Sequence, residues 1–253
     1  MKAEFSEFTY GFSVIRELSE KYSFSEVPIF PSLIDEGKIG GGYDVNAEIE
    51  GIPFFLQFKL SEYLERASSL HYGTFLAPYY RFKLHKNNGY NQHNLLVQLE
   101  KQGNPVFYTA PAFREKKILS LNYFNKDIVK NSIWISPLDI GSINDTSQHY
   151  VCFEKSLKRS YFFSEPVTIS NKLNFDENDD NHPFVKYLET FEVAKTQTWE
   201  QLYYQMLSMI KNLDRKSYIL IKEYSRKHLN YQDKVKEISL LFFGTEILLF
   251  NIM

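Results

Sequence analysis

The order of hydrophobic and polar positions along the chain predicts a regular series of helices and strands. Apolar residues recur at helical spacing over residues 5–22 and 91–102, which predicts two amphipathic helices. Apolar runs predict strands over residues 52–60, 105–110 and 132–137, and a more polar helix is predicted over residues 119–131. Aromatic residues favour an extended segment over residues 73–84, whereas residues 61–69 fit a short helix or an excursion. This order indicates an α/β sheet of mixed direction with helices on both faces.

The pattern changes beyond about residue 142. Short strands are predicted over residues 149–153 and 160–169, and the acidic run 171–182 is typical of a surface loop. Amphipathic segments over residues 184–193, 198–213 and 235–250 predict a helical C-terminal part. We therefore expect a core over residues 1–140 and a partly helical extension over residues 141–253, packed on the core or contacting a partner.

A polar hairpin is predicted in the first half of the chain. Residues 28–42 are rich in Pro and Gly and form a loop that leads into Asp44, Gly51 marks a turn, and residues 52–60 return as a strand. Side chains two apart on a strand share a face, so Gln57 and Lys59 are expected to lie together. A carboxylate, an amide oxygen and an ammonium at one sheet edge can hold a divalent metal, a water and a phosphate.

The spacing Asp44-x12-Gln57-x-Lys59 resembles the motif of the PD-(D/E)xK nuclease superfamily. The resemblance covers just over half of the chain. It implies a restriction-endonuclease-like fold, in which helices flank a mixed central sheet, and cleavage of DNA phosphodiester bonds that depends on Mg²⁺ or Mn²⁺. Gln57 stands where the superfamily usually has a second acid, so the site loses one negative charge, although some members are similar in using Gln at this position.

The resemblance also implies a role for each site residue. Asp44, Gln57 and Glu7 would hold the metal, and Glu7 on the first helix would restore the missing charge. Lys59 would orient or deprotonate the attacking water, or stabilise the phosphate. Two alternatives stay open: Glu7 as an acid that interacts favourably with the helix dipole, and the whole motif as a polar edge hairpin without chemistry. Glu17, near the same helix face, lies too far along the axis to share the ion.

Two further groups of residues are candidates for contact with nucleic acid. Arg81 and Lys83 share a face of the aromatic and basic stretch 79–86 and could grip phosphates; a half-buried strand with a solvated edge explains them equally well. Gln92 and His93 open the next helix, from which polar residues lean over the site in many nucleases of this type. Helix capping by Asn91 is the structural alternative for this second group.

Composition limits the remaining possibilities. The 29 basic and 31 acidic residues give a net charge of -2, so binding to nucleic acid must depend on a local patch. The single cysteine, Cys152, excludes an internal disulfide and suits a reducing cytosol; together with the lack of a signal peptide or membrane span, it predicts a cytoplasmic protein. The aromatic content of 17% favours a ring-rich core and a contact surface. No paired histidine spacing, phosphate-binding loop or nucleophile elbow is present.

The predicted function is that of a cytoplasmic metal-dependent DNA endonuclease. Small nuclease chains of this superfamily commonly serve antiviral defence in bacteria beside an ATPase or helicase, so the resemblance implies such a partner subunit or a homo-oligomer. The alternative is a non-catalytic subunit that keeps the nuclease fold as a nucleic-acid-binding or protein-interaction scaffold, for which Gln57 is the best argument. The choice between DNA and RNA, strandedness, sequence preference and the number of metal ions stay open.

Overall fold

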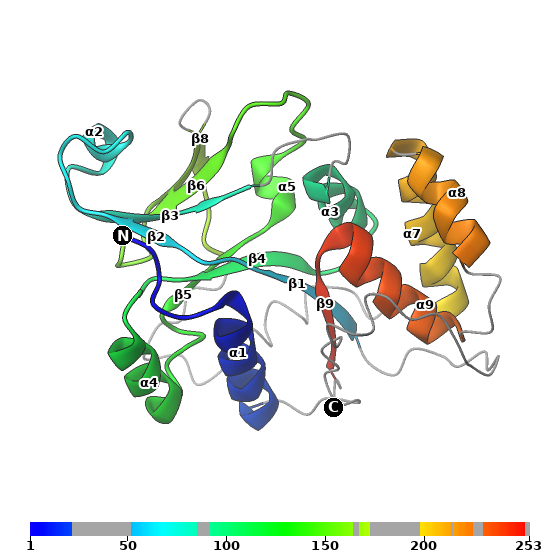
Figure 1. The fold of residues 1–253 in the computed structure, drawn as a ribbon, viewed down its shortest axis with the longest axis horizontal. Coiled ribbons are helices and arrows are strands. Elements are labelled where there is room, and N and C mark those ends of the chain that lie inside the picture. The colour runs from blue at the N-terminus through cyan, green and yellow to red at the C-terminus, as the bar shows by residue number, and fades with distance from the viewer. Residues whose placement is uncertain are drawn as a thin grey trace.

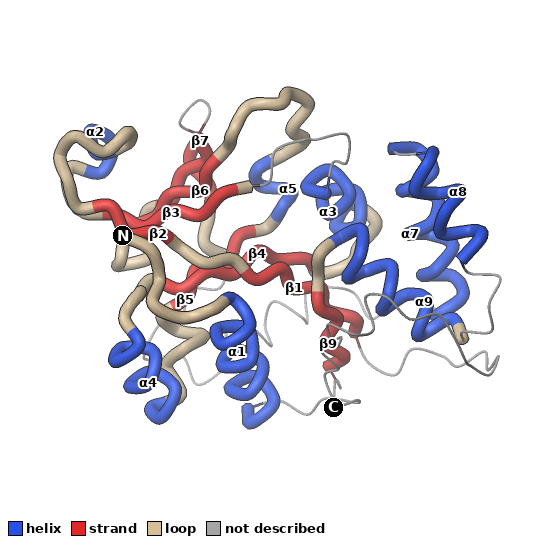
Figure 2. Tube along the Cα trace, in the orientation of Figure 1, coloured by secondary structure: helices blue, strands red, loops and turns tan. Residues whose placement is uncertain are grey.

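A computed structural model shows a mixed α/β fold with two β-sheets and several helices (Figure 1). The residues that it describes are 1–21, 52–84, 92–163, 167–172, 198–213, 215–224 and 230–250. Figure 2 shows the sheets surrounded by helices. The mixed α/β class expected from the sequence is therefore confirmed.

The first sheet has four strands in the order β5-β4-β1-β9. Strand β1 (Ile52–Phe58) runs parallel to β4 (Val106–Pro111) and antiparallel to β9 (Glu246–Phe250), and β5 (Ser132–Ile135) runs antiparallel to β4. Strand β1 is central because its apolar residues are buried on both faces. The arm of the predicted hairpin that carries Asp44 lies outside the described residues.

The two faces of the first sheet pack against different helices. Phe54, Leu56 and Phe58 alternate along β1 and belong to the cluster that includes α1 (Glu7–Lys21) and α4 (Lys116–Asn125). Phe55 points to the opposite face, where α3 (Gln92–Lys101) packs. Gly11 lets α1 approach the sheet closely, since a Cβ there would lie 3.0 Å from the Phe58 ring. Helices thus cover both faces of a mixed sheet, as the sequence predicts.

The second sheet has five antiparallel strands in the order β2-β3-β6-β7-β8. Their bounds are Glu62–Leu64 for β2, Tyr79–Lys83 for β3, Tyr150–Phe153 for β6, Ser160–Phe163 for β7 and Val167–Ile169 for β8. One face joins the core around α3. The other face is partly covered by the short helix α2 (Tyr72–Phe75), whose Phe75 ring stacks on Tyr79 at 4.8 Å.

Two sequence expectations for this region are corrected. Residues 61–69 contain the short strand β2, and the stretch 73–84, expected to be extended throughout, begins with the last residues of α2. Leu76 ends this helix in the left-handed conformation with φ of 55°. Cys152 is fully buried in this sheet, and burial raises the pKa of its thiol to about 12, which agrees with an inert core residue.

The C-terminal part combines helices with a strand. Helix α7 (Trp199–Leu213) packs against α3 and also against α8 (Arg215–Tyr224) and α9 (Tyr231–Ile238) (Figure 1). A π-helical turn, η2 (Ser239–Phe243), follows α9 and contacts α3. The expectation of a helix over residues 235–250 is wrong beyond this turn. Gly244 ends it with φ of 61°, and β9 then pairs with β1.

Both sheets take strands from each side of residue 140, the expected boundary between core and extension. Strand β9 completes the first sheet, and β6, β7 and β8 complete the second. The small helix α5 (Pro137–Ile140) packs on α3, where Glu100 accepts hydrogen bonds from the Ser136 hydroxyl at 2.5 Å and the Leu138 N–H at 2.9 Å. No helix in the described part of the chain is long and apolar enough to cross a membrane.

Candidate functional site

Lys59 lies at the C-terminal end of β1, where the strand leaves the first sheet. Its N–H donates to the carbonyl oxygen of Thr109 at 2.9 Å, which continues the pairing of β1 with β4. The residue is only 7% exposed. Burial lowers the pKa of the ammonium from 10.5 to about 8, against an opposing effect of the negative charge of Glu7. Lys59 therefore titrates close to neutral pH.

Glu7 approaches the same point from the first turn of α1. Burial raises the pKa of its carboxyl group, whereas the positive charge of Lys59 and a hydrogen bond with the backbone of Leu60 lower it. Glu7 is exposed to solvent, whereas Lys59 is buried, so the pair lies at the edge of the core. The acid and the amine that the sequence predicts to share a site are therefore neighbours.

Gln57 lies on the α3 face of β1 and meets Gln92, the first residue of α3. A Cβ built on Gly244 would lie 2.6 Å from Nε2 of Gln57 and 2.0 Å from Nε2 of Gln92. Both amide groups thus occupy the space that a side chain at position 244 would fill. Gln57 is only 5% exposed, so this contact is part of the core.

Gly244 is a site residue that sequence reasoning missed. The sequence contained a signal for a helix end at this position, because a glycine follows an apolar helical run and precedes the segment that becomes β9. The positive φ of Gly244 and the two amides beside it explain why glycine suits this position. The junction between η2 and β9 therefore lies against Gln57 and Gln92.

The structure gives the positions of only some of the expected metal ligands. Glu7 and Gln57 are the expected ligands whose positions the structure gives, and Asp44 lies outside the described residues. Within the described ranges, no group of three or more His, Cys, Asp or Glu side chains could hold a metal ion. The carboxylate of Glu7 and the amide oxygen of Gln57 are both ligand types that Mg²⁺ accepts. Glu7 nevertheless belongs to α1 and neighbours Lys59, whereas Gln57 lies beside Gln92 on the opposite, α3 face of β1, so the structure does not bring these two expected ligands together.

Two other acids, Glu17 and Glu246, lie in this part of the molecule. Glu17 is buried, and its Oε2 accepts hydrogen bonds from the N–H of Ile128 at 2.7 Å and of Val129 at 3.3 Å. Glu246 lies opposite Leu56 in the ladder and therefore on the α1 face, away from Gln57. Burial raises the pKa of Glu246 to about 7. Glu17 has a structural role, and Glu246 is a half-buried acid that the sequence did not single out.

Arg81 and Lys83 share the outer face of β3. Arg81 donates two hydrogen bonds to Oε2 of Glu62, at 2.9 and 3.1 Å, and its guanidinium lies 4.4 Å from the ring centre of Tyr150. Lys83 is exposed to solvent. Lys83 is consequently available to bind a phosphate, whereas Arg81 would first have to break its ion pair with Glu62.

His93 has a structural role in place of the expected phosphate contact. It is 6% exposed, and its Nε2 lies 2.6 Å from the carbonyl oxygen of Gly141. Because a carbonyl only accepts, Nε2 carries the hydrogen, and Nδ1 accepts from the hydroxyl of Tyr108 at 2.8 Å. Burial lowers the pKa of His93 to about 4, so the ring is neutral at physiological pH.

No protein-family model, curated protein or solved structure matches this chain in comparisons of sequence and fold. We therefore infer the function from the residues and their geometry.

Proposed function

We propose that this chain is a metal-dependent endonuclease that cleaves DNA phosphodiester bonds, with a core that resembles restriction-endonuclease-like folds. The observation that carries the proposal is the buried ammonium of Lys59 beside Glu7, two residues from Gln57 on β1. The parallel pairing of β1 with β4 is compatible with such a core; the chain between them runs through β2, α2, β3 and α3.

Cleavage of a phosphodiester requires a nucleophilic water and neutralisation of the charge that develops on phosphorus oxygens. A lysine with a pKa of about 8 exchanges its proton near physiological pH. Its ammonium form stabilises negative charge on the phosphate, and its amine form accepts a proton from water. Glu7 favours the ammonium form and thereby tunes the balance between the two.

In this proposal Asp44, Gln57 and Glu7 hold Mg²⁺ or Mn²⁺. The bound ion would supply charge neutralisation at the phosphate and activation of the water. Because Gln57 is neutral, we expect weaker metal binding than at a site with three carboxylates. Lys83 and Gln92, which lie outside this ligand set, would contact the nucleic-acid backbone.

A second candidate function is a nuclease-fold subunit without catalytic activity. The observation that favours it is the contact of the Gln57 and Gln92 amides at Gly244, which assigns Gln57 a packing role. Such a subunit would bind nucleic acid or a protein partner through the same fold. It differs from the enzyme in measurable ways, because it would neither bind Mn²⁺ at this site nor nick DNA.

A plasmid-nicking assay with Mg²⁺ or Mn²⁺ tests the proposal, together with calorimetric titration of the metal. We expect wild-type protein to bind metal and nick the plasmid, and expect Asp44→Ala and Lys59→Ala to lose nicking while remaining folded. Lys155→Ala, which removes an exposed lysine, and Glu20→Gln, which neutralises another acid on α1, are matched controls that should retain activity. Nicking at the wild-type rate by Lys59→Ala or Asp44→Ala would refute the catalytic assignment. Folded wild-type protein that neither binds metal nor nicks would favour the second function.

A further inference from the structure

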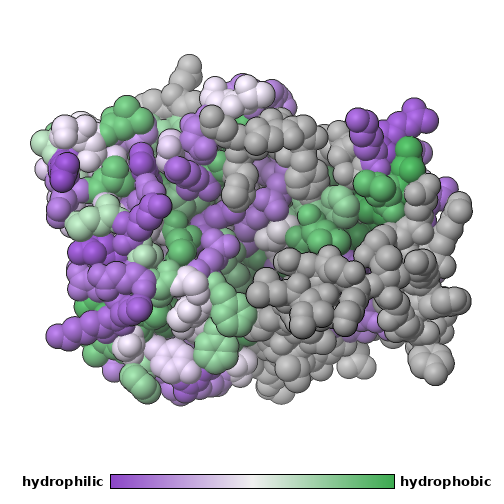
Figure 3. Space-filling view, in the orientation of Figure 1, coloured by the Kyte–Doolittle hydropathy of each residue, from purple (hydrophilic) through white to green (hydrophobic). Residues whose placement is uncertain are grey.

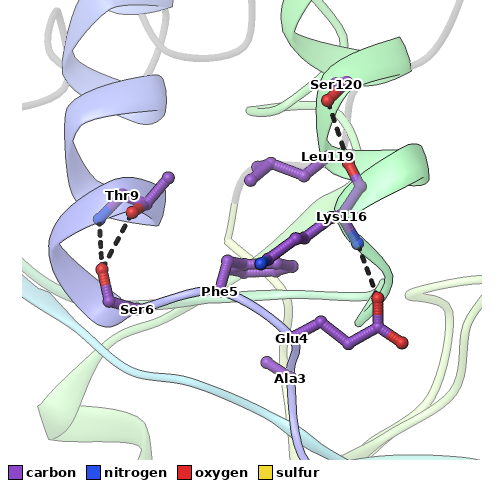
Figure 4. Close-up of a pocket in the computed structure, with 8 residues that line it drawn as sticks. All are labelled: Ala3, Glu4, Phe5, Ser6, Thr9, Lys116, Leu119 and Ser120. Carbon is purple, nitrogen blue, oxygen red and sulfur yellow. Dashed lines mark hydrogen bonds between the residues drawn. The ribbon is translucent and has the colours of Figure 1, made fainter.

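A hollow separates the chain before α1 from the first turns of α4 (Figure 4). Its volume is about 640 Å³, within the range of ligand-binding clefts. Phe5 and Leu119 are buried apolar residues that line it, and Lys116 extends from α4 toward α1 across it. The remaining lining residues are Ala3, Glu4, Ser6, Thr9 and Ser120. We call this hollow the α1–α4 groove.

Exposed apolar side chains continue from the groove along both helices. Phe12 of α1 stacks on Tyr123 of α4 with ring centres 6.5 Å apart, and Tyr123 contacts Phe124 at 5.5 Å. Phe12 is 46% exposed, Leu121 55% and Phe124 78%. Figure 3 shows hydrophobic surface among hydrophilic side chains over this part of the molecule. Large apolar side chains gathered at a surface commonly mark a contact with another molecule.

The charges beside the groove are unbalanced. Helix α4 carries Lys116 and Lys117 and has no acidic residue. The neighbouring acids already have partners, since Glu4 accepts from the N–H of Lys116 at 3.2 Å and lies 3.6 Å from Arg114, and Glu20 pairs with Arg16. Among the described residues, no ion pair joins Lys116 or Lys117 to an acid. A ligand that brings its own carboxylates would therefore complement this surface.

We propose that the α1–α4 groove docks a segment of a partner protein in which an apolar side chain lies next to Asp or Glu. The apolar side chain would fill the hollow against Phe5 and Leu119. The carboxylate would pair with the Lys116 ammonium, and further apolar residues would cover Tyr123 and Phe124. Aromatic anchors at the centre and charged residues at the rim are the usual anatomy of such an interface.

Two other occupants fit these observations less well. An anionic bilayer could pair with the lysines but would leave the hollow between Phe5 and Leu119 unfilled. A second copy of this chain docked by two-fold symmetry would set the same surface against itself. Its lysines would then face a surface whose neighbouring acids already have partners. The partner segment is the occupant that satisfies both the shape and the charge.

Selection from a random dodecapeptide library displayed on phage tests the inference with the full chain and does not depend on cleavage. Enriched peptides should combine Asp or Glu with Leu, Ile or Phe. By fluorescence anisotropy they should bind Lys116→Glu and Phe124→Ser at least tenfold more weakly than wild type. Leu220→Ser is the matched control, because Leu220 on α8 is also exposed, at 64%, and lies outside the groove. Thermal melting establishes that each variant is folded.

Several results would contradict docking of a partner segment in the α1–α4 groove. Enrichment of basic peptides, no enrichment at all, or equal binding to wild type and both groove variants would overturn the proposal. Cosedimentation with vesicles containing anionic phospholipid, lost in Phe124→Ser, would assign the surface to a membrane. A concentration-dependent dimer seen by light scattering, lost in the same variant, would assign it to a second copy. Because none of these measurements uses metal or DNA, their outcome is independent of the nuclease assignment.

Discussion

Lys59 has an environment that is costly for an ammonium group. It is 7% exposed, its pKa is lowered to about 8, and the carboxyl group of Glu7 opposes this lowering. Buried charges of this kind are uncommon in positions that serve folding alone, and perturbed lysines concentrate at functional sites. The cost of burying the charge is therefore consistent with a role in chemistry.

Stability should depend on pH through Lys59. In the unfolded chain the lysine titrates near its ordinary value of 10.5, so the cost of the buried charge is fully present below about pH 8 and disappears as pH rises toward 10.5. The pKa difference corresponds to roughly 3 kcal/mol as an upper estimate. We expect Lys59→Met to raise the free energy of unfolding at pH 7 by about 1 to 3 kcal/mol. Above pH 8, the free energy of unfolding should increase less with pH in the variant than in the wild type.

Urea unfolding at pH 7 and pH 9.5 measures both effects, and Lys83→Met serves as the control because Lys83 is exposed. A Lys59→Met variant that is less stable than wild type at pH 7 would show that the ammonium has stronger compensating contacts than Glu7.

Glu7 should affect the titration of Lys59. Because the carboxylate raises the pKa of the lysine, Glu7→Gln should lower that pKa below about 8. A pH titration of the lysine side chain by ¹⁵N NMR reports the change directly. Glu20→Gln, farther along α1, should leave the pKa of Lys59 unchanged. Identical titration of Lys59 in wild type and Glu7→Gln would mean that the two groups do not interact.

At the residue scale the sequence predicted part of the site. The resemblance placed Glu7 and Lys59 together, and the two residues are neighbours. Strand periodicity predicted that Gln57 and Lys59 share a face, whereas Gln57 lies beside Gln92 of α3 and Lys59 beside Glu7 of α1. The neutral, buried state of His93 was not predictable, because its partners Tyr108 and Gly141 come from distant parts of the chain. Single-residue chemistry depends on neighbours that only tertiary structure brings together.

The junction between η2 and β9 is the element that lies against Gln57 and Gln92. Gly244 has φ of 61° and would place a Cβ 2.0 Å from Gln92 and 2.6 Å from Gln57. Gly103 provides a natural comparison, because its φ is also positive, 89°, but nothing lies within 4 Å of a Cβ there. Comparing substitutions at the two glycines therefore separates the cost of backbone strain from the cost of steric conflict.

We expect Gly103→Ala to cost about 1 to 2 kcal/mol of stability through strain alone. Gly244→Ala should cost at least about 1 kcal/mol more, because it also displaces the buried amide of Gln57 and the half-buried amide of Gln92. The double variant Gln92→Ala/Gly244→Ala should recover part of that excess, since the closest atom belongs to Gln92. Urea unfolding of the three variants gives the comparison. Equal costs at the two glycines would mean that the amides do not pack against Gly244.

The segment after Gly244 shows why element type was harder to predict than element position. Residues 246–250 form an apolar run that is short enough to be helix or strand, and sequence pattern alone favoured continuation of the preceding helix. Pairing with the edge of β1 decides the outcome. In contrast, α1, α3, β4 and β5 have clear periodicity or clear boundaries, and they were predicted within a few residues.

At the scale of the whole molecule, both sheets depend on the second half of the chain. Strand β9 pairs with the central strand β1, and β6 pairs with β3. We therefore expect a fragment of residues 1–140 to lack a cooperative thermal transition, because both β1 and β3 would lose a neighbouring strand. Calorimetry of the fragment and of the full chain tests this. A fragment that melts cooperatively, with native-like circular dichroism, would instead establish residues 1–140 as an independent domain.

The proposed function requires Glu7, Gln57 and Asp44 to bind one metal ion near Lys59, although Gln57 lies on the α3 face of β1 and Glu7 on α1. The most direct measurement is an anomalous difference map from crystals soaked in Mn²⁺. We expect a peak coordinated by the Glu7 carboxylate, the Gln57 amide oxygen and Asp44, with Lys59 nearby. A map without a peak at these residues, from crystals in which the site is open to solvent, would contradict the claim.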